Sequence, residues 1–250
     1  MVVAGKEAMA ALLEVDRLRK RYGAVVVADD ITLSLEPRCC LGLIGPNGAG
    51  KSSLFNMITG IIAPDHGSIR FEGRDIGRVA PHLRARLGIV RAFQIPRPFT
   101  QLSVYENVLT AASYGAGLST AAAQRRAVEV LDMTGLLHRA EIPAGQLRLL
   151  DRKRLELAKA IASNAKLLLL DEIASGLTEH EVAALVELIV GLKHGHAIIW
   201  IEHIPHALRA VADRIIVLHF GRKLLEGPPE DVMASPVMRE IYMGLAADAA

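Results

Sequence analysis

The sequence lacks several features that mark particular classes of protein. It contains no apolar run of about 18 residues, the length that a membrane-spanning helix needs. Its two cysteines, Cys39 and Cys40, are neighbours, so they can neither link distant segments through a disulfide nor supply the spaced ligands of a zinc site. Lys and Arg outnumber Asp and Glu by only 29 − 27 = 2, which gives no basic field of the kind that nucleic-acid-binding proteins carry. We therefore predict no nucleic-acid partner and no membrane span.

The beginning of the chain also lacks the pattern of a secretory signal. Residues 1–11 include Lys6 and Glu7 and contain neither a sustained apolar core nor a secretory cleavage pattern. We therefore expect the chain to stay in the cytosol.

The chain is instead rich in alternating apolar and helical segments. Stretches of Val, Ile and Leu alternate with helical patterns, an order typical of a mainly parallel sheet covered by helices. We predict an α/β fold, and 250 residues suit one domain with a small lobe. The expected strands are 25–33, 40–44, 68–71, 89–93, 166–170, 197–202 and 214–219.

One stretch, from about residue 103 to 162, breaks this alternation. It is rich in Ala, favours helix and has no clear strand. We expect a helical lobe over about 95–162, inserted into a sheet-containing core of about 1–94 and 163–250.

The most specific motif fits G-x-x-x-x-G-K-[ST] and reads Gly45-Pro46-Asn47-Gly48-Ala49-Gly50-Lys51-Ser52. An apolar strand precedes it and a helical pattern follows, which is the context of a phosphate-binding loop. Glycines let the backbone curl until N–H groups point inward, and the helix adds the positive end of its dipole. We predict a P-loop NTPase sheet domain that binds ATP, with Ser53 beside the loop, Lys51 on the β and γ phosphates and Ser52 on Mg²⁺. The alternative is a glycine-rich turn with a solvated lysine.

A second motif is the apolar run 167–170, which ends in Asp171 and Glu172. Such a pair is expected where a buried strand emerges beside a nucleotide. We predict that Asp171 binds Mg²⁺, directly or through water, and that Glu172 polarises the water that attacks the γ phosphate. A solvated strand end would be the better interpretation if the phosphate-binding loop were absent.

In the order of its motifs, the chain resembles the ATP-binding subunit of an ABC transporter over nearly its whole length. The resemblance implies that Tyr22 stacks on adenine, and that Gln94 senses Mg²⁺ and the γ phosphate and links the core to the helical lobe. It also implies that His203 contacts the γ phosphate during hydrolysis and that 175–178 is a dimer-contacting loop. The alternatives are a surface tyrosine and a solvated or structural histidine.

Four segments, 94–99, 104–108, 201–203 and 241–244, are similar to the branched-chain amino-acid importer branch of that family. This resemblance implies import of branched-chain or other hydrophobic amino acids, or of urea and short amides. It implies a second ATPase subunit, different or identical, two membrane permeases and an external solute-binding protein. The chain would then lie peripherally on the cytoplasmic face of the inner membrane.

The segment 147–151 departs from the family signature Leu-Ser-Gly-Gly-Gln. Arg148 stands in place of the serine, and Leu150 replaces a glycine whose missing side chain lets backbone approach the partner's γ phosphate. We expect a poor signature surface and hence an asymmetric heterodimer. The alternative is that Arg148 contacts the phosphate through its charge.

Three other functions remain open. A soluble ABC ATPase acting on DNA or ribosomes usually has fused ATPase units or long coiled-coil or basic insertions, and none is visible in the sequence. An exporter or lipid-extraction ATPase would share every nucleotide-binding residue named above. The third is a protein that binds ATP without hydrolysing it, because the signature is altered.

Overall fold

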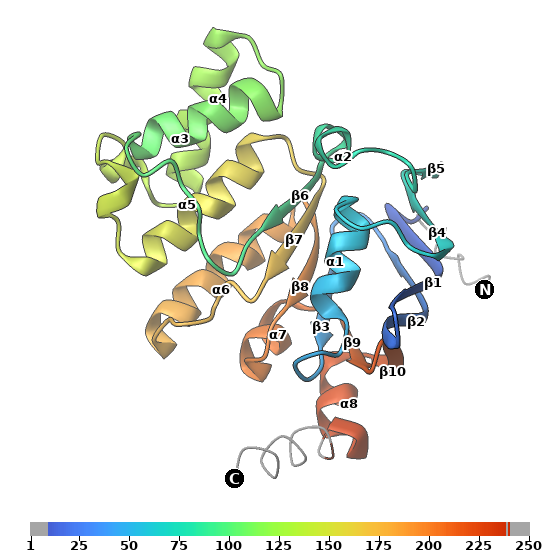
Figure 1. Cartoon of the computed structure of the whole chain (residues 1–250). Coiled ribbons are helices and arrows are strands. Elements are labelled where there is room, and N and C mark those ends of the chain that lie inside the picture. Colours follow the sequence, from blue (N-terminus) through green and yellow to red (C-terminus); the bar gives the residue numbers. More distant parts are fainter. Residues whose placement is uncertain (1–9, 239, 241–250) are drawn as a thin grey trace, which may run out of the picture.

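A computed structural model describes residues 10–238 and 240 of the chain. The similarity noted at 241–244 lies outside these residues. Figure 1 shows a central sheet flanked by helices, a second sheet near the N-terminus and a separate group of helices. None of the described helices is both long and apolar enough to cross a membrane.

The central sheet has six strands in the order β10-β9-β3-β8-β7-β6. Strand β10 is antiparallel to β9, and the other pairs are parallel. Every residue of β3, β7 and β8 is buried, as expected for a parallel sheet covered on both faces. The strands are β3 (Cys40–Ile44), β6 (Ile89–Ala92), β7 (Leu167–Asp171), β8 (Ala197–Ile201), β9 (Arg214–His219) and β10 (Arg222–Gly227).

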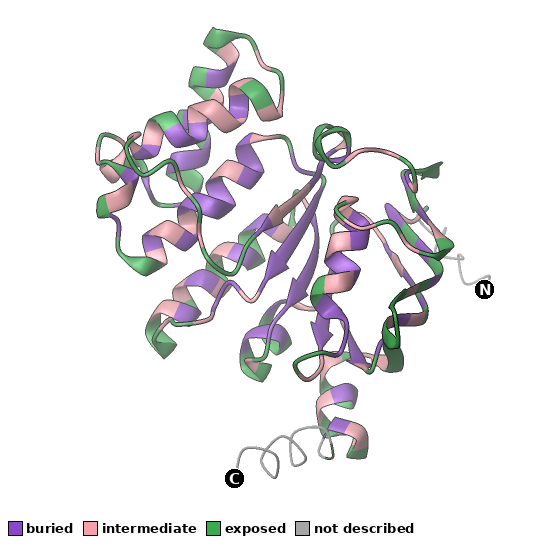
Figure 2. Ribbon diagram, in the orientation of Figure 1, coloured by how far each residue is buried: buried purple, intermediate pink, exposed green. Residues whose placement is uncertain are grey.

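Two apolar cores cover the faces of this sheet, and its central strands are coloured as buried in Figure 2. Leu167 and Leu169 of β7 face the core that contains α1, whereas Leu168 and Leu170 face the core that contains α5, α6 and α7. Trp200 of β8 is fully buried in the second core, and its indole Nε1 has no hydrogen-bond partner among the described residues. The helices around the sheet are α1 (Lys51–Thr59), α2 (Pro81–Leu87), α6 (Glu179–Lys193), α7 (Pro205–Val211) and α8 (Pro229–Ala234).

The second sheet is antiparallel and has the order β2-β1-β4-β5. Its strands are β1 (Leu13–Tyr22), β2 (Val25–Leu35), β4 (His66–Phe71) and β5 (Arg74–Asp75). Leu13, Val15 and Leu18 of β1 are buried against the core that contains α1. The register between β1 and β2 shifts after Val15, and Arg17 has a φ of 47°, in the left-handed region.

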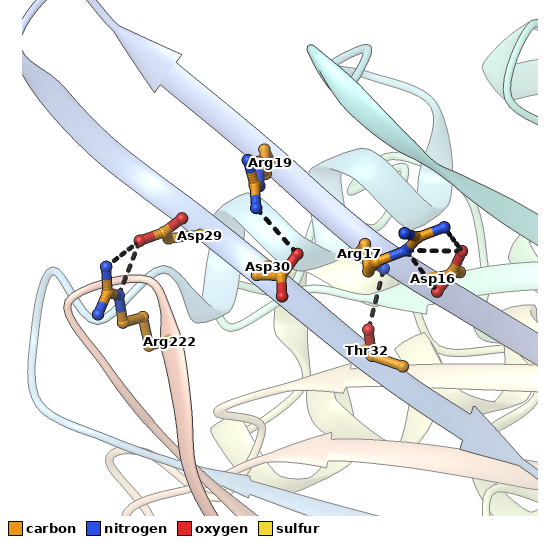
Figure 3. A network of polar contacts seen from close by, with 7 residues as sticks. All are labelled: Asp16, Arg17, Arg19, Asp29, Asp30, Thr32 and Arg222. Carbon is orange, nitrogen blue, oxygen red and sulfur yellow. Dashed lines mark hydrogen bonds and ion pairs between the residues drawn. The ribbon is translucent and has the colours of Figure 1, made fainter.

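Charged side chains line the exposed positions of β1 and β2 (Figure 3). The Arg19 guanidinium lies 3.3 Å from the Asp30 carboxylate, and Arg222, in β10, lies 2.6 Å from Asp29. Because exposed ion pairs contribute about 1 kcal/mol or less, these contacts add little stability. The Arg222–Asp29 pair ties the start of β10 to β2.

The helices between β6 and β7 lie together at one side of the central sheet (Figure 1). They are α3 (Val104–Thr110), the π-helix η1 (Ala111–Gly115), α4 (Thr120–Met133), the 3-10 turns η2 (Leu137–Arg139) and η3 (Ala144–Gln146), and α5 (Leu149–Ala162). A capping box between Ser103 and Glu106 begins α3. In the described residues between β6 and β7, β pairing is limited to one isolated bridge, Ser103 to Pro143.

The predicted strands agree with the structure to within two residues at each end, and β3 and β9 have the predicted bounds. The fold class is confirmed, and the structure adds β1, β5 and β10, which were not predicted. The prediction of a mainly parallel sheet holds for the central sheet alone, because β1, β2, β4 and β5 form a separate antiparallel sheet.

Candidate functional site

The loop between β3 and α1 needs glycine at two positions. Gly50 is the N-cap of α1 with a φ of 99°, and a Cβ there would lie 2.2 Å from the carbonyl oxygen of Val27. A Cβ on Gly45 would lie 2.1 Å from the carbonyl oxygen of Leu218. The loop can therefore pack against β2 and β9 while its backbone N–H groups stay free of side-chain bulk.

Lys51 begins α1 and is buried. Its Nζ donates hydrogen bonds to the carbonyl oxygens of Gly45, at 2.6 Å, and Pro46, at 3.0 Å. Burial lowers the pKa of Lys51, and the charges of Glu172 and Asp171 act in the opposite direction. The ammonium group thus lies over the loop, bound to carbonyl oxygens that a phosphate could replace.

A cavity of about 180 Å³ brings the loop and one carboxylate together. It is lined by Val27, by residues 47–53 and by Glu172. The structure therefore unites six predicted phosphate-loop residues, Ser53 and the predicted catalytic carboxylate in one hollow. Tyr22, Gln94, Asp171 and His203 do not line it.

The two carboxylates after β7 point to different partners. Asp171 is buried and forms an ion pair with the guanidinium of Arg91. Glu172 has a φ of 46°, a left-handed conformation that costs about 1–3 kcal/mol in a non-glycine residue. Its Oε2 accepts a hydrogen bond of 2.9 Å from Nε2 of Gln94. The structure therefore joins Gln94 to Glu172, the carboxylate that lines the phosphate-loop cavity.

His203 lies just beyond β8, and its side chain is 61% exposed. Its Nδ1 lies 3.1 Å from Oε1 of Glu202, whose side chain is fully buried. Glu202 also accepts hydrogen bonds from the backbone N–H groups of His203, at 2.9 Å, and Ala174, at 3.1 Å. Burial raises the pKa of Glu202, and these hydrogen bonds oppose the rise. Glu202 was not predicted as a site residue. The sequence signal for it was a carboxylate that directly follows the five apolar residues 197–201.

Tyr22 ends β1 and is 49% exposed. The Nζ of Lys20 lies 5.3 Å from the centre of its ring, a distance compatible with a cation–π contact. The ring therefore has an open face, and adenine stacking stays a prediction.

Helix α5 holds the loop that follows Gln94. Lys153 donates from Nζ to the carbonyl oxygen of Gln94. Glu156 accepts from the backbone N–H of Arg97 at 2.9 Å, and Lys159 donates to the carbonyl oxygen of Arg97 at 3.1 Å. These three residues recur at a spacing of three and so share one helix face. In the sequence, these residues could have been noticed as charged residues at helical spacing among apolar ones. Lys153, Glu156 and Lys159 were not predicted as site residues.

Residues 147–151, which differ from the family signature, lie at the start of α5. Arg148 is the N-cap and provides no side-chain hydrogen bond to the helix. Arg148 and Leu149 are exposed, and Leu150 is half-buried. Asp151 is turned inward and forms ion pairs with Arg139, at 3.2 Å, and Arg154, at 3.8 Å.

The three side chains predicted to bind Mg²⁺ carry oxygen atoms, the kind of ligand that a hard cation prefers. They are the Ser52 hydroxyl, the Asp171 carboxylate and the Gln94 amide. Among the described residues, no group of three or more His, Cys, Asp or Glu could hold a metal by itself. Mg²⁺ is commonly held by one or two carboxylates together with substrate phosphates, so these residues fit a Mg²⁺ ion that is bound along with nucleotide.

One family model covers the phosphate loop and the acidic pair after β7. The model described as ABC transporter matches residues 28–175. The chain belongs to this ABC transporter family. A cassette of this family is an ATPase subunit of a transporter complex with membrane components, and nucleotide binding is therefore part of its function.

Relatives of this cassette include proteins of different transport systems. It is 36% identical over 251 residues to the "High-affinity branched-chain amino acid transport ATP-binding protein LivG" of Salmonella typhimurium, covering 94% of this chain and 98% of that protein. It is 32% identical over 237 residues to the "Lipopolysaccharide export system ATP-binding protein LptB" of Acidithiobacillus ferridurans, with the same coverage of 94% and 98%. The crystal structure of the ADP conformation of MJ1267, an ATP-binding cassette of an ABC transporter, matches it with a TM-score of 0.85 and 28% identity, over 94% of this chain and 100% of that chain.

Proposed function

We propose that this cassette binds MgATP at residues 45–53 and hydrolyses it with Glu172 as the group that polarises water. The observation that carries the proposal is the cavity that the phosphate loop shares with Glu172. Lys51 would hold the β and γ phosphates, and His203 would contact the γ phosphate. Ser52, Asp171 and Gln94 would hold Mg²⁺, which supplies positive charge next to the phosphates.

We further propose that hydrolysis drives import of branched-chain or other hydrophobic amino acids, or of urea and short amides. The similarity to LivG over 94% of the chain supports this choice. An exporter or lipid-extraction system is the second candidate, because LptB is similar over the same share of the chain. A non-transport regulatory ATPase has no comparable support.

The proposed partners are a second ATPase subunit, two membrane permeases and, indirectly, a solute-binding protein. The cassette would lie peripherally on the cytoplasmic face of the inner membrane. The surface near Gln94 suits contact with a permease, because Phe93, Ile95 and Phe99 are exposed there. A heterodimer is favoured over a homodimer because the start of α5 offers a cationic N-cap and leucines in place of the family's serine and glycines.

Phosphate release tests the catalytic proposal. We expect Glu172→Gln to slow release by the purified complex by about a hundredfold or more, the usual contribution of a positioned acid or base. MgATP binding should persist, because the loop is unchanged. Glu187→Gln, at an exposed position of α6, is the control. Equal rates in wild type and Glu172→Gln would exclude the proposed role of Glu172.

Purification from membranes tests the transport system. We expect two permeases to copurify, and the solute-binding protein of the system to bind L-leucine, urea or a short amide. Copurification with a lipid-extracting permease pair that has no solute-binding protein would instead support the exporter candidate.

A further inference from the structure

Arg91 lies at the junction of three nucleotide-binding segments. It is in β6, where it pairs with Leu169 of β7. Because alternate residues of a strand share one face, the Arg91 side chain is on the same face of the sheet as Leu169 and Asp171. That face is covered by α1, the helix that follows the phosphate loop.

The guanidinium of Arg91 contacts all three segments. Nη2 pairs with Oδ2 of Asp171, and Nη1 donates a hydrogen bond of 2.7 Å to Oδ1 of Asn56 in α1. The guanidinium carbon lies 5.6 Å from the ring centre of Phe55 and 4.8 Å from that of Phe93. Arg91 thus joins the helix of the phosphate loop, the acidic end of β7 and the residue before Gln94.

The Arg91–Asp171 pair is largely withdrawn from water. The side chains are 9% and 11% exposed, and Nε of Arg91 has no hydrogen-bond partner among the described residues. Few buried donors in native proteins lack a partner. The pair therefore sets a positive charge against Asp171 where little water reaches either side chain.

That charge bears on metal binding. A divalent cation that approached Asp171 would meet a fixed positive charge within contact distance of the same carboxylate, and repulsion between cations is strong where water is excluded. The phosphates of a nucleotide would add negative charge on the other side of the ion. The balance of charge at Asp171 thus opposes a free cation and permits one that arrives with phosphates.

We infer that Arg91 is an internal counter-cation that makes divalent-metal binding at Asp171 conditional on nucleotide. The inference rests on the proposed role of Asp171 as a Mg²⁺ ligand. Arg91 acts here as a positioning residue, since it works through Asp171.

Mn²⁺ binding to the full-length chain without nucleotide provides the test, with free Mn²⁺ measured by electron paramagnetic resonance. We expect weak binding by the wild type and binding at least about tenfold tighter by Arg91→Gln, because a charge at contact distance is removed. The matched control is Arg214→Gln, which removes an arginine that pairs with Glu36 and Glu226 away from the phosphate loop. Glu226 keeps its ion pair with Lys223. A gain confined to Arg91→Gln supports the inference, and an equal gain in both variants overturns it.

A second measurement compares ATP affinity with Mg²⁺ and with EDTA. We expect the ratio of the two affinities to fall in Arg91→Gln, because its metal binding no longer depends on phosphates. Arg91→Lys, which keeps the charge, should stay close to the wild type. An unchanged ratio in Arg91→Gln would contradict the inference.

Two further measurements of Mn²⁺ binding complete the test, one on the wild type and one on a double variant. Tight Mn²⁺ binding by the nucleotide-free wild type overturns the inference even if Arg91→Gln does not fold. Adding Asp171→Asn to Arg91→Gln should abolish the gained binding. If the gain survives, the metal lies elsewhere and the inference fails, whereas the role of Glu172 is judged separately by phosphate release.

Discussion

At the scale of single residues, Glu202 joins two parts of the site that are separate in sequence. Its carboxylate accepts a hydrogen bond of 3.1 Å from the backbone N–H of Ala174, in the loop after Glu172, and one of 2.9 Å from the backbone N–H of His203. Its Oε1 also lies 3.1 Å from Nδ1 of His203. Glu202 therefore holds the backbone of His203 beside the loop that follows Glu172.

We expect Glu202→Gln to slow phosphate release on the order of tenfold, because an amide presents an NH₂ group to one of these donors. MgATP affinity should be unchanged. The melting temperature should change little, because removing a buried charge offsets the lost hydrogen bonds. Phosphate-release assays with Glu226→Gln as control would check this. A normal rate in Glu202→Gln would show that His203 needs no such support.

Site residues were predictable where the motif is continuous in sequence. Residues 45–53, Asp171 and Glu172 follow apolar strands and are recognisable by that context alone. Arg91, Glu202 and Lys153 were not predictable as site residues, because their roles depend on contacts such as Arg91 with Asp171, 80 positions apart. Charged side chains are common throughout the chain, and only the fold shows which of them are buried.

At the scale of elements, one arginine links α2 to the end of α1. Arg84 is buried and donates to the carbonyl oxygens of Met57 and Ile58, the last turn of α1. It also donates to the carbonyl oxygens of Val79 and Gly77. Carbonyl groups at a helix end lack a partner within the helix. The guanidinium donates to Ile58 and adds a second donor at Met57, which also accepts from the backbone N–H of Gly60. It thereby fixes the end of the helix that follows the phosphate loop.

We expect Arg84→Met to lower the free energy of unfolding by about 3 kcal/mol, because the carbonyl oxygens of four residues each lose a donor. Urea unfolding followed by circular dichroism would measure the change. Arg86→Met is the control on the same helix, since Arg86 is exposed, and it should stay within about 0.5 kcal/mol of the wild type. Equal stabilities of the two variants would contradict this account.

Strands rich in charged residues were harder to predict than the apolar central strands. Strands β3, β7 and β8 are continuous apolar runs, which signal burial on both faces. Strand β1 contains six charged residues, and its bulge at Arg17 interrupts the alternation that would mark a strand. Strand β10 begins with two charges and lies at an edge, where such residues prevent pairing with other chains.

At the scale of the whole molecule, the start of α5 bears on how two cassettes would assemble. An arginine N-cap without a side-chain hydrogen bond leaves the first helical N–H groups uncapped and places a positive charge at the positive end of the helix dipole. Leu149 and Leu150 add bulk where the family has glycine. This surface would meet the nucleotide of a partner subunit poorly unless Arg148 itself contacts the phosphate.

We expect the double variant Arg148→Ser, Leu150→Gly to raise phosphate release of the assembled complex about twofold, as a second of two sites becomes active. Arg125→Ser, at an exposed position of α4, is the control. An unchanged or lower rate would count against impairment and would favour direct phosphate contact by Arg148.

The buried indole of Trp200 has a consequence for observing this molecule. The chain contains one tryptophan. It lies in the middle of the central sheet, and within the described part of the chain its ring N–H has no hydrogen-bond partner. A fully buried indole emits at short wavelength and is shielded from dissolved quenchers. The fluorescence of Trp200 therefore reports whether the central sheet is intact, without any added label.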